Sequence, residues 1–453
     1  MLDYNPTQTV ADLLDVLVTL NPWWSGKGFD TGIRRERYFS TIKRFLASGE
    51  IVVLSGVRRA GKTTLLYQII DDLIATGEAN PRKILFVNCD EPEISRLDHP
   101  LETVLETYRR EICSEEGAFL VFDEIQNVEG WERWIKSIYD RKTFRLIITG
   151  SSSYLLDSRL STLISGRYLP VNVYPLDFAE YLRFNDVSVE KDAVALAAEK
   201  FTLMRLLKTY LREGGFPMVV LQDDEATKKA QLEVYYDSIV YRDIVLTNNI
   251  RNQKSLNDLL TYFLTNFTSP YSYRSLETVL GLDFATIKEY IHYAEIAKIL
   301  FEVRYFSYSL RTQARQPRKM YCVDNGLRNA VSFRFSGDEG RLAENLVFIE
   351  LQKRGFRPNY WKKEGEVDFV IRHPDDTLTA INVTYTDTIA ERESRGLREF
   401  ADEFAPRVRD LIILTRDTAK TENGIRFIPL WKWLLSAGSP APPALAPGGR
   451  HAN

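Results

Sequence analysis

The sequence has few of the residues that bind transition metals or form disulfides. Its 453 residues include 3 cysteines and 4 histidines. Cys89, Cys113 and Cys322 are scattered and odd in number, which is typical of free thiols in a reducing compartment rather than of a disulfide framework. No histidine lies near a cysteine at ligand spacing, so the sequence argues against a zinc site.

Long apolar runs and a dominant charge are also missing. No stretch reaches the roughly 18 apolar residues of a membrane helix, and the N-terminal MLDYNPTQTV is unlike a signal peptide. We therefore expect a cytoplasmic protein without a membrane segment. The net charge of −3 neither requires nor excludes nucleic acid, which would need a local basic surface. The length predicts roughly two to four domains.

What the sequence does contain is a phosphate-binding loop. GVRRAGKTTLL, Gly56 to Leu66, follows an apolar run and precedes a helical pattern. Strand, glycine-rich loop and helix are the context in which such a loop works. Gly56 and Gly61 would let successive N–H groups point at phosphate oxygens, at the positive end of the helix.

ATP and Mg²⁺ are the cofactors that this loop predicts. Lys62 would reach the β- and γ-phosphates, and the Thr63 hydroxyl would take one position on Mg²⁺. The residues expected to bind the nucleotide are Gly56, Val57, Arg58, Arg59, Ala60, Gly61, Lys62, Thr63 and Thr64.

The residues around the loop alternate between strand and helix patterns, which predicts a parallel sheet with crossover helices. Before it, we expect a basic helix from Arg34 to Leu46 and an N-terminal arm anchored by Trp23 and Trp24. The predicted strands are Ile51–Ser55, Ile84–Asn88, Phe119–Asp123, Arg145–Thr149 and Tyr168–Val173. The predicted helices are Thr63–Ala75, Leu101–Cys113 and Trp131–Tyr139.

Two strand ends carry candidate catalytic residues. Asp123 would hold the magnesium ion through a water ligand, and Glu124 beside it would orient and polarise the attacking water. The next strand ends in three serines, of which Ser151 is expected to touch the γ-phosphate or the attacking water. The alternative for Ser151 is an N-cap of the following helix.

These motifs resemble the additional-strand catalytic-glutamate class of P-loop ATPases, the AAA+ group especially. The segment SGRYLPVNVYPLDFAEYL, Ser165 to Leu182, and the two arginines of the loop are similar to archaeal and bacterial ATPases with a conserved C-terminal module. The resemblance implies a helical lid containing the turn Gly214–Pro217, and a homo-oligomeric ring, for example a hexamer. Arg167 would sense the nucleotide, act as an arginine finger in a neighbouring subunit, or be structural. Arg242 would face a subunit interface or solvent.

The next segment has the order of a winged helix: helix, short turn, second helix, then a β-hairpin. The second helix, Phe284 to Ala294, would be the recognition helix. The hairpin interleaves cations with aromatic residues, which suits a phosphate backbone and stacked bases, so DNA is the expected partner. A soluble hairpin with aromatics in its core, or a winged helix that binds protein, is the alternative. The candidate nucleic-acid residues are Arg304, Arg311, Arg315, Arg318 and Lys319.

The C-terminal domain resembles the PD-(D/E)xK nuclease fold, in which acids and a lysine gather magnesium and activate water. Glu344 and Asp368 match the helix glutamate and strand aspartate, with Glu366 nearby. Asn382 and Thr384 stand where an active member has its glutamate and its lysine. Without that carboxylate and the only cation, we expect a catalytically dead nuclease fold.

The sequence thus predicts an α/β protein: a P-loop AAA+ core with a parallel sheet, a helical lid, a winged helix and a C-terminal α/β restriction-endonuclease-like domain. The favoured function is an ATP-hydrolysing motor that binds and remodels or translocates DNA, branched or single-stranded. A nucleotide-controlled switch with a protein partner and an ATP-gated DNA nuclease are the alternatives. The expected boundaries are 1–30 for the arm, 31–182 for the core, 183–250 for the lid, 251–335 for the winged helix, 336–435 for the nuclease-like domain and 436–453 for a disordered tail.

Overall fold

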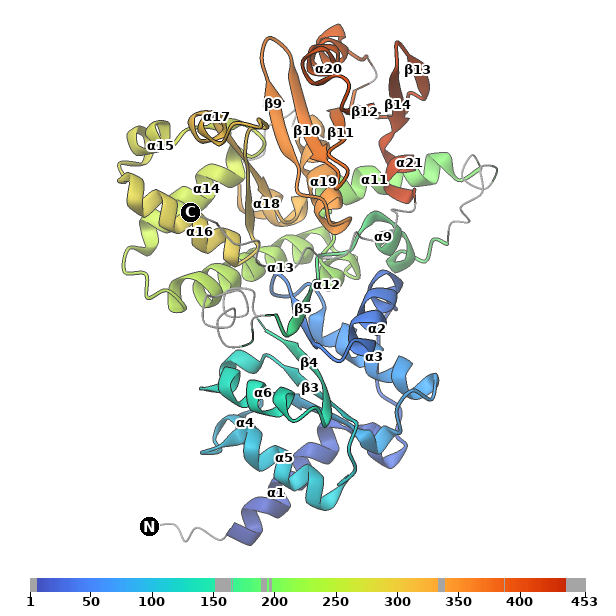
Figure 1. Cartoon of the computed structure of the whole chain (residues 1–453), viewed down its shortest axis with the longest axis vertical. Coiled ribbons are helices and arrows are strands. Elements are labelled where there is room, and N and C mark those ends of the chain that lie inside the picture. The colour runs from blue at the N-terminus through green and yellow to red at the C-terminus, as the bar shows by residue number, and fades with distance from the viewer. Residues whose placement is uncertain are drawn as a thin grey trace. The chain divides into compact units, whose positions relative to one another are not determined.

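The computed structural model describes residues 6–150, 164, 166–188, 194, 198–332, 339–386 and 388–436 (Figure 1). The chain divides into two compact units, with the boundary between Val173 and Tyr174. The tail from residue 437, which the sequence predicts to be disordered, lies outside the described residues.

The first unit is built on a parallel sheet. In its described residues the strand order is β2-β3-β4-β1-β5, so β4 lies between the strand of the phosphate loop and the strand of Asp123. The first three strands are buried along most of their length, as continuous apolar runs in parallel sheets are. The strands are β1 (Ile51–Ser55), β2 (Ile84–Asn88), β3 (Ala118–Asp123), β4 (Phe144–Thr149) and β5 (Tyr168–Asn172).

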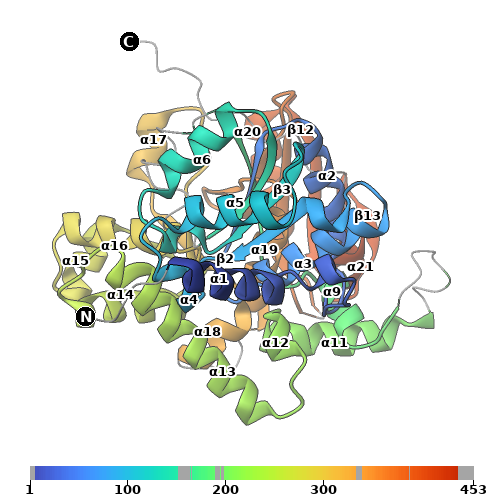
Figure 2. The same ribbon diagram turned by 90° about the horizontal axis from the view of Figure 1, so that it is seen from below.

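The N-terminal segment covers the edge strand β2 of this sheet. The Asn21 side chain accepts a hydrogen bond from the Phe86 N–H and donates one to the Phe86 carbonyl, at 2.7 and 2.9 Å. The indole N–H groups of Trp23 and Trp24 both donate to the Ile84 carbonyl. The two tryptophans are therefore buried within their own unit, and the polar edge of β2 is blocked. Helix α1 (Pro6–Leu20) lies beside α5 (Pro100–Glu111) and β2 (Figure 2).

The helices of the first unit largely follow the predicted pattern. The expected basic helix from Arg34 begins only at Phe39, after a 3-10 turn at Glu36–Tyr38, and the Arg35 side chain before that turn is buried. The remaining helices are α2 (Phe39–Ala47), α3 (Lys62–Ala75), α4 (Pro92–Ser95), α5 (Pro100–Glu111) and α6 (Trp131–Asp140).

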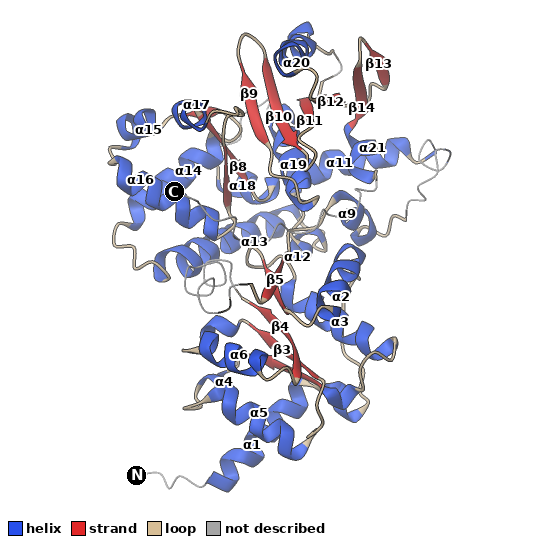
Figure 3. Ribbon diagram, viewed as in Figure 1, coloured by secondary structure: helices blue, strands red, loops and turns tan. Residues whose placement is uncertain are grey.

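The second unit begins with a helical region (Figure 3). Helix α13 continues into a π-helical segment, Ile239–Leu246. The helices are α9 (Phe178–Phe184), α11 (Lys200–Glu213), α12 (Pro217–Val220), α13 (Glu225–Ser238) and α14 (Gln253–Thr265).

A small antiparallel sheet with two helices follows. Its order, in the described residues, is β6-β8-β7. The expected hairpin is interrupted by a short helix, α17, between β7 and β8. The elements are β6 (Pro270–Tyr271), α15 (Tyr273–Leu280), α16 (Phe284–Ile296), β7 (Leu300–Val303), α17 (Leu310–Arg315), β8 (Arg318–Cys322) and α18 (Asn325–Val331).

The C-terminal part is a mixed sheet with helices packed against it. Its order over the described residues is β13-β14-β12-β11-β10-β9, with β11, β12 and β14 parallel and the outer pairs antiparallel. Helices α19 and α20 pack on this sheet, and nine residues of α19 are buried. The elements are α19 (Glu339–Lys353), β9 (Asn359–Lys362), β10 (Glu366–Arg372), β11 (Leu378–Thr384), α20 (Glu391–Phe404), β12 (Val408–Thr415), β13 (Lys420–Glu422), β14 (Ile425–Pro429) and α21 (Leu430–Leu435).

Candidate functional site

The phosphate loop joins the end of β1 to the start of α3. Gly61 has a φ of 90° and caps the helix, so the free N–H groups of the first turn of α3 face the loop. Gly56 is required for another reason. A Cβ at Gly56 would lie 2.0 Å from the Val173 carbonyl oxygen, so only glycine fits where the loop leaves the sheet.

Lys62 lies at the centre of this loop. Its side chain is 5% exposed, and its Nζ donates to the carbonyl oxygens of Gly56 at 3.1 Å and Val57 at 3.4 Å. The side chains of Val57 and Ala60 are buried, so these two residues offer only their backbone to a ligand. An ammonium held by neutral carbonyls is well placed to exchange them for phosphate oxygens, which bind a cation more strongly.

A hydrogen-bonded group connects the loop to the ends of two strands. The Thr63 hydroxyl donates to Asp123 Oδ2 at 2.7 Å, and the Thr149 hydroxyl donates to Asp123 Oδ1. Burial raises the pKa of Asp123, while the hydrogen bonds from Thr149 and Thr63 oppose that rise. A threonine hydroxyl and a carboxylate are the hard oxygen ligands that Mg²⁺ prefers beside a nucleotide. These residues therefore fit a magnesium–nucleotide complex.

Glu124 follows Asp123 in a left-handed conformation, with a φ of 51°. This backbone conformation is uncommon for a residue with a side chain, and such residues gather at functional sites. The Thr149 hydroxyl accepts a hydrogen bond from the Glu124 N–H at 3.1 Å, and Gln126 Nε2 donates to Glu124 Oε2 at 2.6 Å. Both the backbone and the carboxylate of Glu124 are thus oriented.

Two supporting residues escaped the sequence analysis. Thr149 holds both Asp123 and Glu124, and its position at the end of β4, next to the predicted serines, was the available signal. Arg35 is buried behind the loop and donates from Nη1 to the Ala60 carbonyl at 2.8 Å. Its only sequence signal was membership of the predicted basic helix, Arg34 to Leu46.

The structure corrects the expectation for Arg167 in its own subunit. The Arg167 carbonyl accepts from the Ile51 N–H, so Arg167 lies at the start of β5 and β1, whereas the phosphate loop follows their ends. A strand of this length separates the two edges by roughly 16 Å. Arg167 Nη2 instead lies 3.7 Å from Asp140 Oδ1. Ser151, the other expected contact of the γ-phosphate, lies outside the described residues.

The basic hairpin of the second unit is also different from the expectation. Arg304, Arg311 and Arg315 are exposed. Arg318 forms an ion pair with Glu302 at 2.7 Å, and Lys319 is buried. Lys319 is therefore not available at the surface, and Arg318 is engaged by Glu302, so neither side chain supports the expected contact with nucleic acid.

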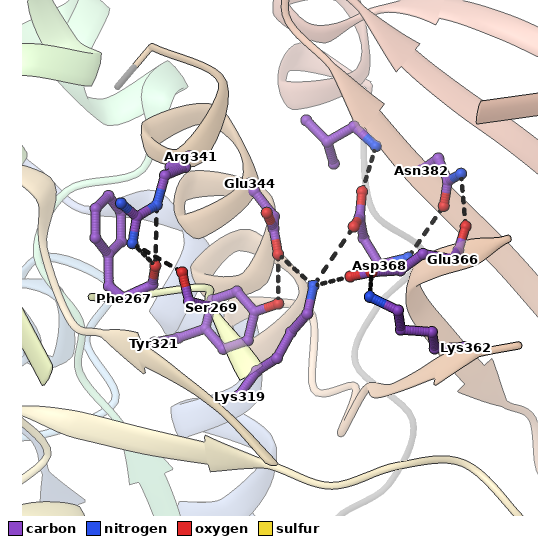
Figure 4. Close-up of polar contacts among 11 residues, drawn as sticks. Phe267, Ser269, Lys319, Tyr321, Arg341, Glu344, Lys362, Glu366, Asp368 and Asn382 are labelled. Atoms are coloured by element: carbon purple, nitrogen blue, oxygen red, sulfur yellow. Dashed lines mark hydrogen bonds and ion pairs between the residues drawn. The ribbon is translucent and has the colours of Figure 1, made fainter. Parts of the chain in front are cut away.

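Lys319 lies among the acids of the nuclease-like motif (Figure 4). Its Nζ is 3.1 Å from Glu344 Oε1, 2.7 Å from Glu366 Oε1 and 3.6 Å from Asp368 Oδ1. Burial opposes its charge, but Glu344 and the other acids raise its pKa well above the ordinary value. The expectation that this site had lost its only cation is thus wrong, since β8 supplies one from outside the motif.

Asn382 and Asp368 are both held by backbone groups in this cluster. The Asn382 side chain accepts from the Asp368 N–H and donates to the carbonyls of Glu366 and Glu393, each at 3.0 Å. The Val383 N–H donates to Asp368 Oδ2, and burial, with the charge of Glu344, raises the pKa of Asp368 to about 8. Across the described parts of the chain, no three or more His, Cys, Asp or Glu side chains are placed to hold a metal ion. The residues here do not fit the metal that the nuclease resemblance implies.

Comparison with protein families divides the chain into three matched segments. Residues 48–182 match the family described as "AAA domain". Residues 204–338 match "Domain of unknown function (DUF8612)", and residues 339–433 match "Domain of unknown function (DUF4143)". The phosphate loop and its carboxylates thus lie in a P-loop domain of the AAA type, as the resemblance implied.

Curated relatives match nearly the whole chain. "Uncharacterized protein MJ1544" of Methanocaldococcus jannaschii is 32% identical over 410 residues, which cover 86% of this chain and 89% of that protein. The chain belongs to the MJ1544 family. It is also similar to an "Uncharacterized protein" of Haemophilus influenzae, 29% identical over 410 residues, covering 89% of this chain and 98% of that protein. Neither of these two names states an activity.

Solved structures give weaker likenesses to this member of the MJ1544 family. The Aeropyrum pernix Orc1 protein in complex with DNA has a TM-score of 0.30 and 14% identity, covering 66% of this chain and 92% of that chain. AMPPCP-bound DnaA from Aquifex aeolicus has a TM-score of 0.27 and 14% identity, covering 58% of this chain and 89% of that chain. Scores this low support no inference about function. None of the described helices combines the length and apolar character needed to cross a bilayer.

Proposed function

We propose that this protein hydrolyses ATP at the phosphate loop of its AAA domain. The observation that carries the proposal is the arrangement around Asp123. One carboxylate oxygen accepts from Thr63 of the loop helix and the other from Thr149 of the adjacent strand. Glu124, the next residue, has its carboxylate oriented by Gln126. This brings the expected magnesium ligands and the expected base to one edge of the sheet.

Each residue has a distinct task in this reaction. Bound Mg²⁺–ATP would supply a γ-phosphoryl group made electrophilic by the metal. Lys62 would move from the loop carbonyls to phosphate oxygens and neutralise their charge. Thr63 and Asp123 would orient the complex, and the Glu124 carboxylate would accept a proton from the attacking water. Thr149 would hold Asp123 and Glu124 in position through its hydroxyl group.

We further propose that ATP turnover is coupled to DNA. The support is the second unit, where α14, β6, α15, α16, β7 and β8 follow one another in the order of a winged helix. Three cations on or near its hairpin are exposed, Arg304, Arg311 and Arg315, and Tyr308 between them is 44% exposed. Exposed arginine and tyrosine side chains suit a phosphate backbone and an unstacked base. Assembly into a ring, with Arg167 of one subunit reaching the nucleotide of the next, belongs to the same proposal.

A switch that acts on a protein partner is the second candidate. Apolar side chains are exposed on the consecutive elements α12, α13 and the π-helix. Where such side chains form one contiguous patch, they are typical of sites that bind other proteins. These side chains are Met218, Leu221, Val234, Tyr241 and Leu246.

One experiment separates the two candidates. We would measure the ATPase rate and the oligomeric state with no DNA, and with duplex, single-stranded and four-way-junction DNA. Stimulation by one form of DNA, together with a DNA-bound oligomer, would support the motor. An ATPase rate that is the same with and without DNA, in a protein that does not bind DNA even at low salt, would rule out the DNA function. The protein-directed switch would then remain. Absence of Glu124-dependent hydrolysis would rule out the ATPase itself.

A further inference from the structure

The cluster around Lys319 unites a lysine from one part of the second unit with acids from another. Lys319 belongs to β8 of the small antiparallel sheet. Glu344 lies on α19, and Glu366 and Asp368 lie on β10 of the mixed sheet. All three acids point at the one ammonium group (Figure 4). The ammonium thus occupies the space between the carboxylates where the nuclease resemblance would place a metal ion.

Lys319 is fixed in this position from several sides. Its backbone pairs with Val303 of β7 and Pro270 of β6. The Asn345 side chain of α19 accepts from the Cys322 N–H at 2.9 Å and donates to the Cys322 carbonyl at 3.0 Å, which fixes α19 against β8. The Lys319 side chain is only 3% exposed. It cannot leave the cluster for solvent without moving β8 or α19.

The charges and distances also suit an ammonium better than a metal. Mg²⁺ and Ca²⁺ hold their oxygen ligands at about 2.0–2.6 Å, whereas Lys319 Nζ lies 2.7–3.6 Å from the three acids. Lys362 gives Glu366 a second cationic partner at 2.9 Å. The Tyr321 hydroxyl donates to Glu344 at 2.7 Å. The carboxylates therefore already have cations and a hydrogen-bond donor without any ion from solution.

We propose that Lys319 is a built-in replacement for the divalent cation of this nuclease-like site. Its ammonium closes the site to metal and ties β8 to the C-terminal domain through Glu344, Glu366 and Asp368. The domain is then a metal-free ion-pair cluster rather than a metal-dependent nuclease. This inference does not depend on the ATPase or on DNA binding. It predicts that removing the ammonium uncovers a divalent-cation site that the native protein lacks.

The test measures Mn²⁺ binding by electron paramagnetic resonance in nucleotide-free protein. Wild type and Asp368→Asn should bind equal amounts of Mn²⁺, because Asp368 holds no ion in the native protein. Lys319→Met should bind one additional Mn²⁺ per chain, and the double variant Lys319→Met, Asp368→Asn should lose it again. The phosphate loop is the same in all four proteins, so its own Mn²⁺ binding cancels.

Three results would overturn the inference. The first is Mn²⁺ bound to wild type and lost in Asp368→Asn. The second is folded Lys319→Met without an additional ion, and the third is Mn²⁺-dependent DNA cleavage by wild type that Asp368→Asn abolishes. If Lys319→Met folds only when Mn²⁺ is present, the metal has taken over the role of the ammonium, which supports the inference. If it does not fold at all, the comparison of wild type with Asp368→Asn decides.

Discussion

The Gly215 N–H donates a hydrogen bond of 2.7 Å to the Asp324 carboxylate, across 109 residues of sequence. Asp324 also caps α18 by accepting from the Leu327 N–H at 2.9 Å. A Cβ at Gly214 would lie 2.0 Å from Asp324 Oδ1. The glycine turn in the helical region is thus built around a buried carboxylate that follows β8, which explains the glycine at position 214; a Cβ at Gly215 would instead lie 2.6 Å from the Leu176 carbonyl oxygen.

Gly214→Ala should destabilise the second unit. The residue has a φ of 77°, and the added methyl group meets Asp324, so both strain and overlap act together. We expect the free energy of unfolding to fall by about 2 kcal/mol or more, measured by urea denaturation. Gly340→Ala is the matched control, because a Cβ there meets nothing within 4 Å and alanine favours its helix. Equal stability of the two variants would contradict the packing described here.

Glu124→Gln should abolish turnover and preserve binding. The amide cannot accept the proton of the attacking water, so we expect the ATPase rate to fall by about 10²–10⁴-fold. The affinity for ATP, measured by fluorescence titration, should change little. Glu129→Gln serves as the control, since Glu129 is an exposed acid on the same loop. A Glu124→Gln protein that turns over normally would exclude this residue as the base.

Thr149→Val and Thr149→Ser should differ sharply. Valine keeps the shape of the side chain but removes the hydroxyl that donates to Asp123 and accepts from the Glu124 N–H. Supporting residues of this kind typically change metal affinity or activity by about 10–100-fold, so Thr149→Val should need more Mg²⁺ and hydrolyse ATP more slowly. Serine retains the hydroxyl and should remain active. The measurement is the Mg²⁺ dependence of the ATPase rate, and identical curves would contradict the assignment.

Replacing Arg311 and Arg315 by alanine should weaken DNA binding, whereas Arg318→Ala should not act in this way. The first two are exposed on α17, while Arg318 is held by Glu302. The slope of log affinity against log salt is negative, and each lost phosphate contact should reduce its magnitude by about one, so the double variant should reduce it by about two. Fluorescence anisotropy at several salt concentrations measures this slope. If Arg318→Ala reduced the salt dependence of DNA binding and the Arg311, Arg315 double variant did not, the assignment of these residues would be wrong.

Stability should depend on pH through Asp368. Its folded-state pKa is raised to about 8, above an unfolded value of about 3.9. The folded state therefore favours the protonated form. The contribution of Asp368 to stability is fully present below about pH 4 and is lost as the pH rises through about 8. Asp368→Asn stays neutral and should flatten this part of the curve, measured by urea unfolding across the range. An unchanged pH dependence would contradict the raised pKa.

The sequence was informative wherever the evidence was local. The phosphate loop, the apolar strands and the acids at the end of β3 are contiguous patterns, whereas the order of the sheet, with β4 between β1 and β3, came from the structure. Arg167 could already be excluded from sensing the nucleotide of its own subunit. It precedes a strand parallel to β1, so it had to lie at the edge opposite the loop.

The side chains that the sequence could not place act over long distances. Arg35 reaches Ala60 only because the chain before β1 folds back behind the loop. Lys319 was assigned to a DNA-binding hairpin because its neighbours are basic, yet its partners come 25 to 49 residues later, Glu344 to Asp368. The nuclease-like motif lacks its lysine at position 384, and Lys319 belongs to the basic hairpin. Only the three-dimensional structure shows that Lys319 lies among the acids of that motif.

The close approach of Gly56 to Val173 has a mechanical consequence. The Val173 N–H also donates to the Ser55 carbonyl at 2.7 Å. A hydrogen bond thus joins Ser55, the residue before the loop, to Val173, the residue at the boundary of the first unit. The next peptide along the chain begins the second unit. Because an added Cβ at Gly56 would overlap the Val173 carbonyl, this loop residue has no space to move toward Val173. The chain therefore leaves the first unit directly beside the phosphate loop, one residue after Val173.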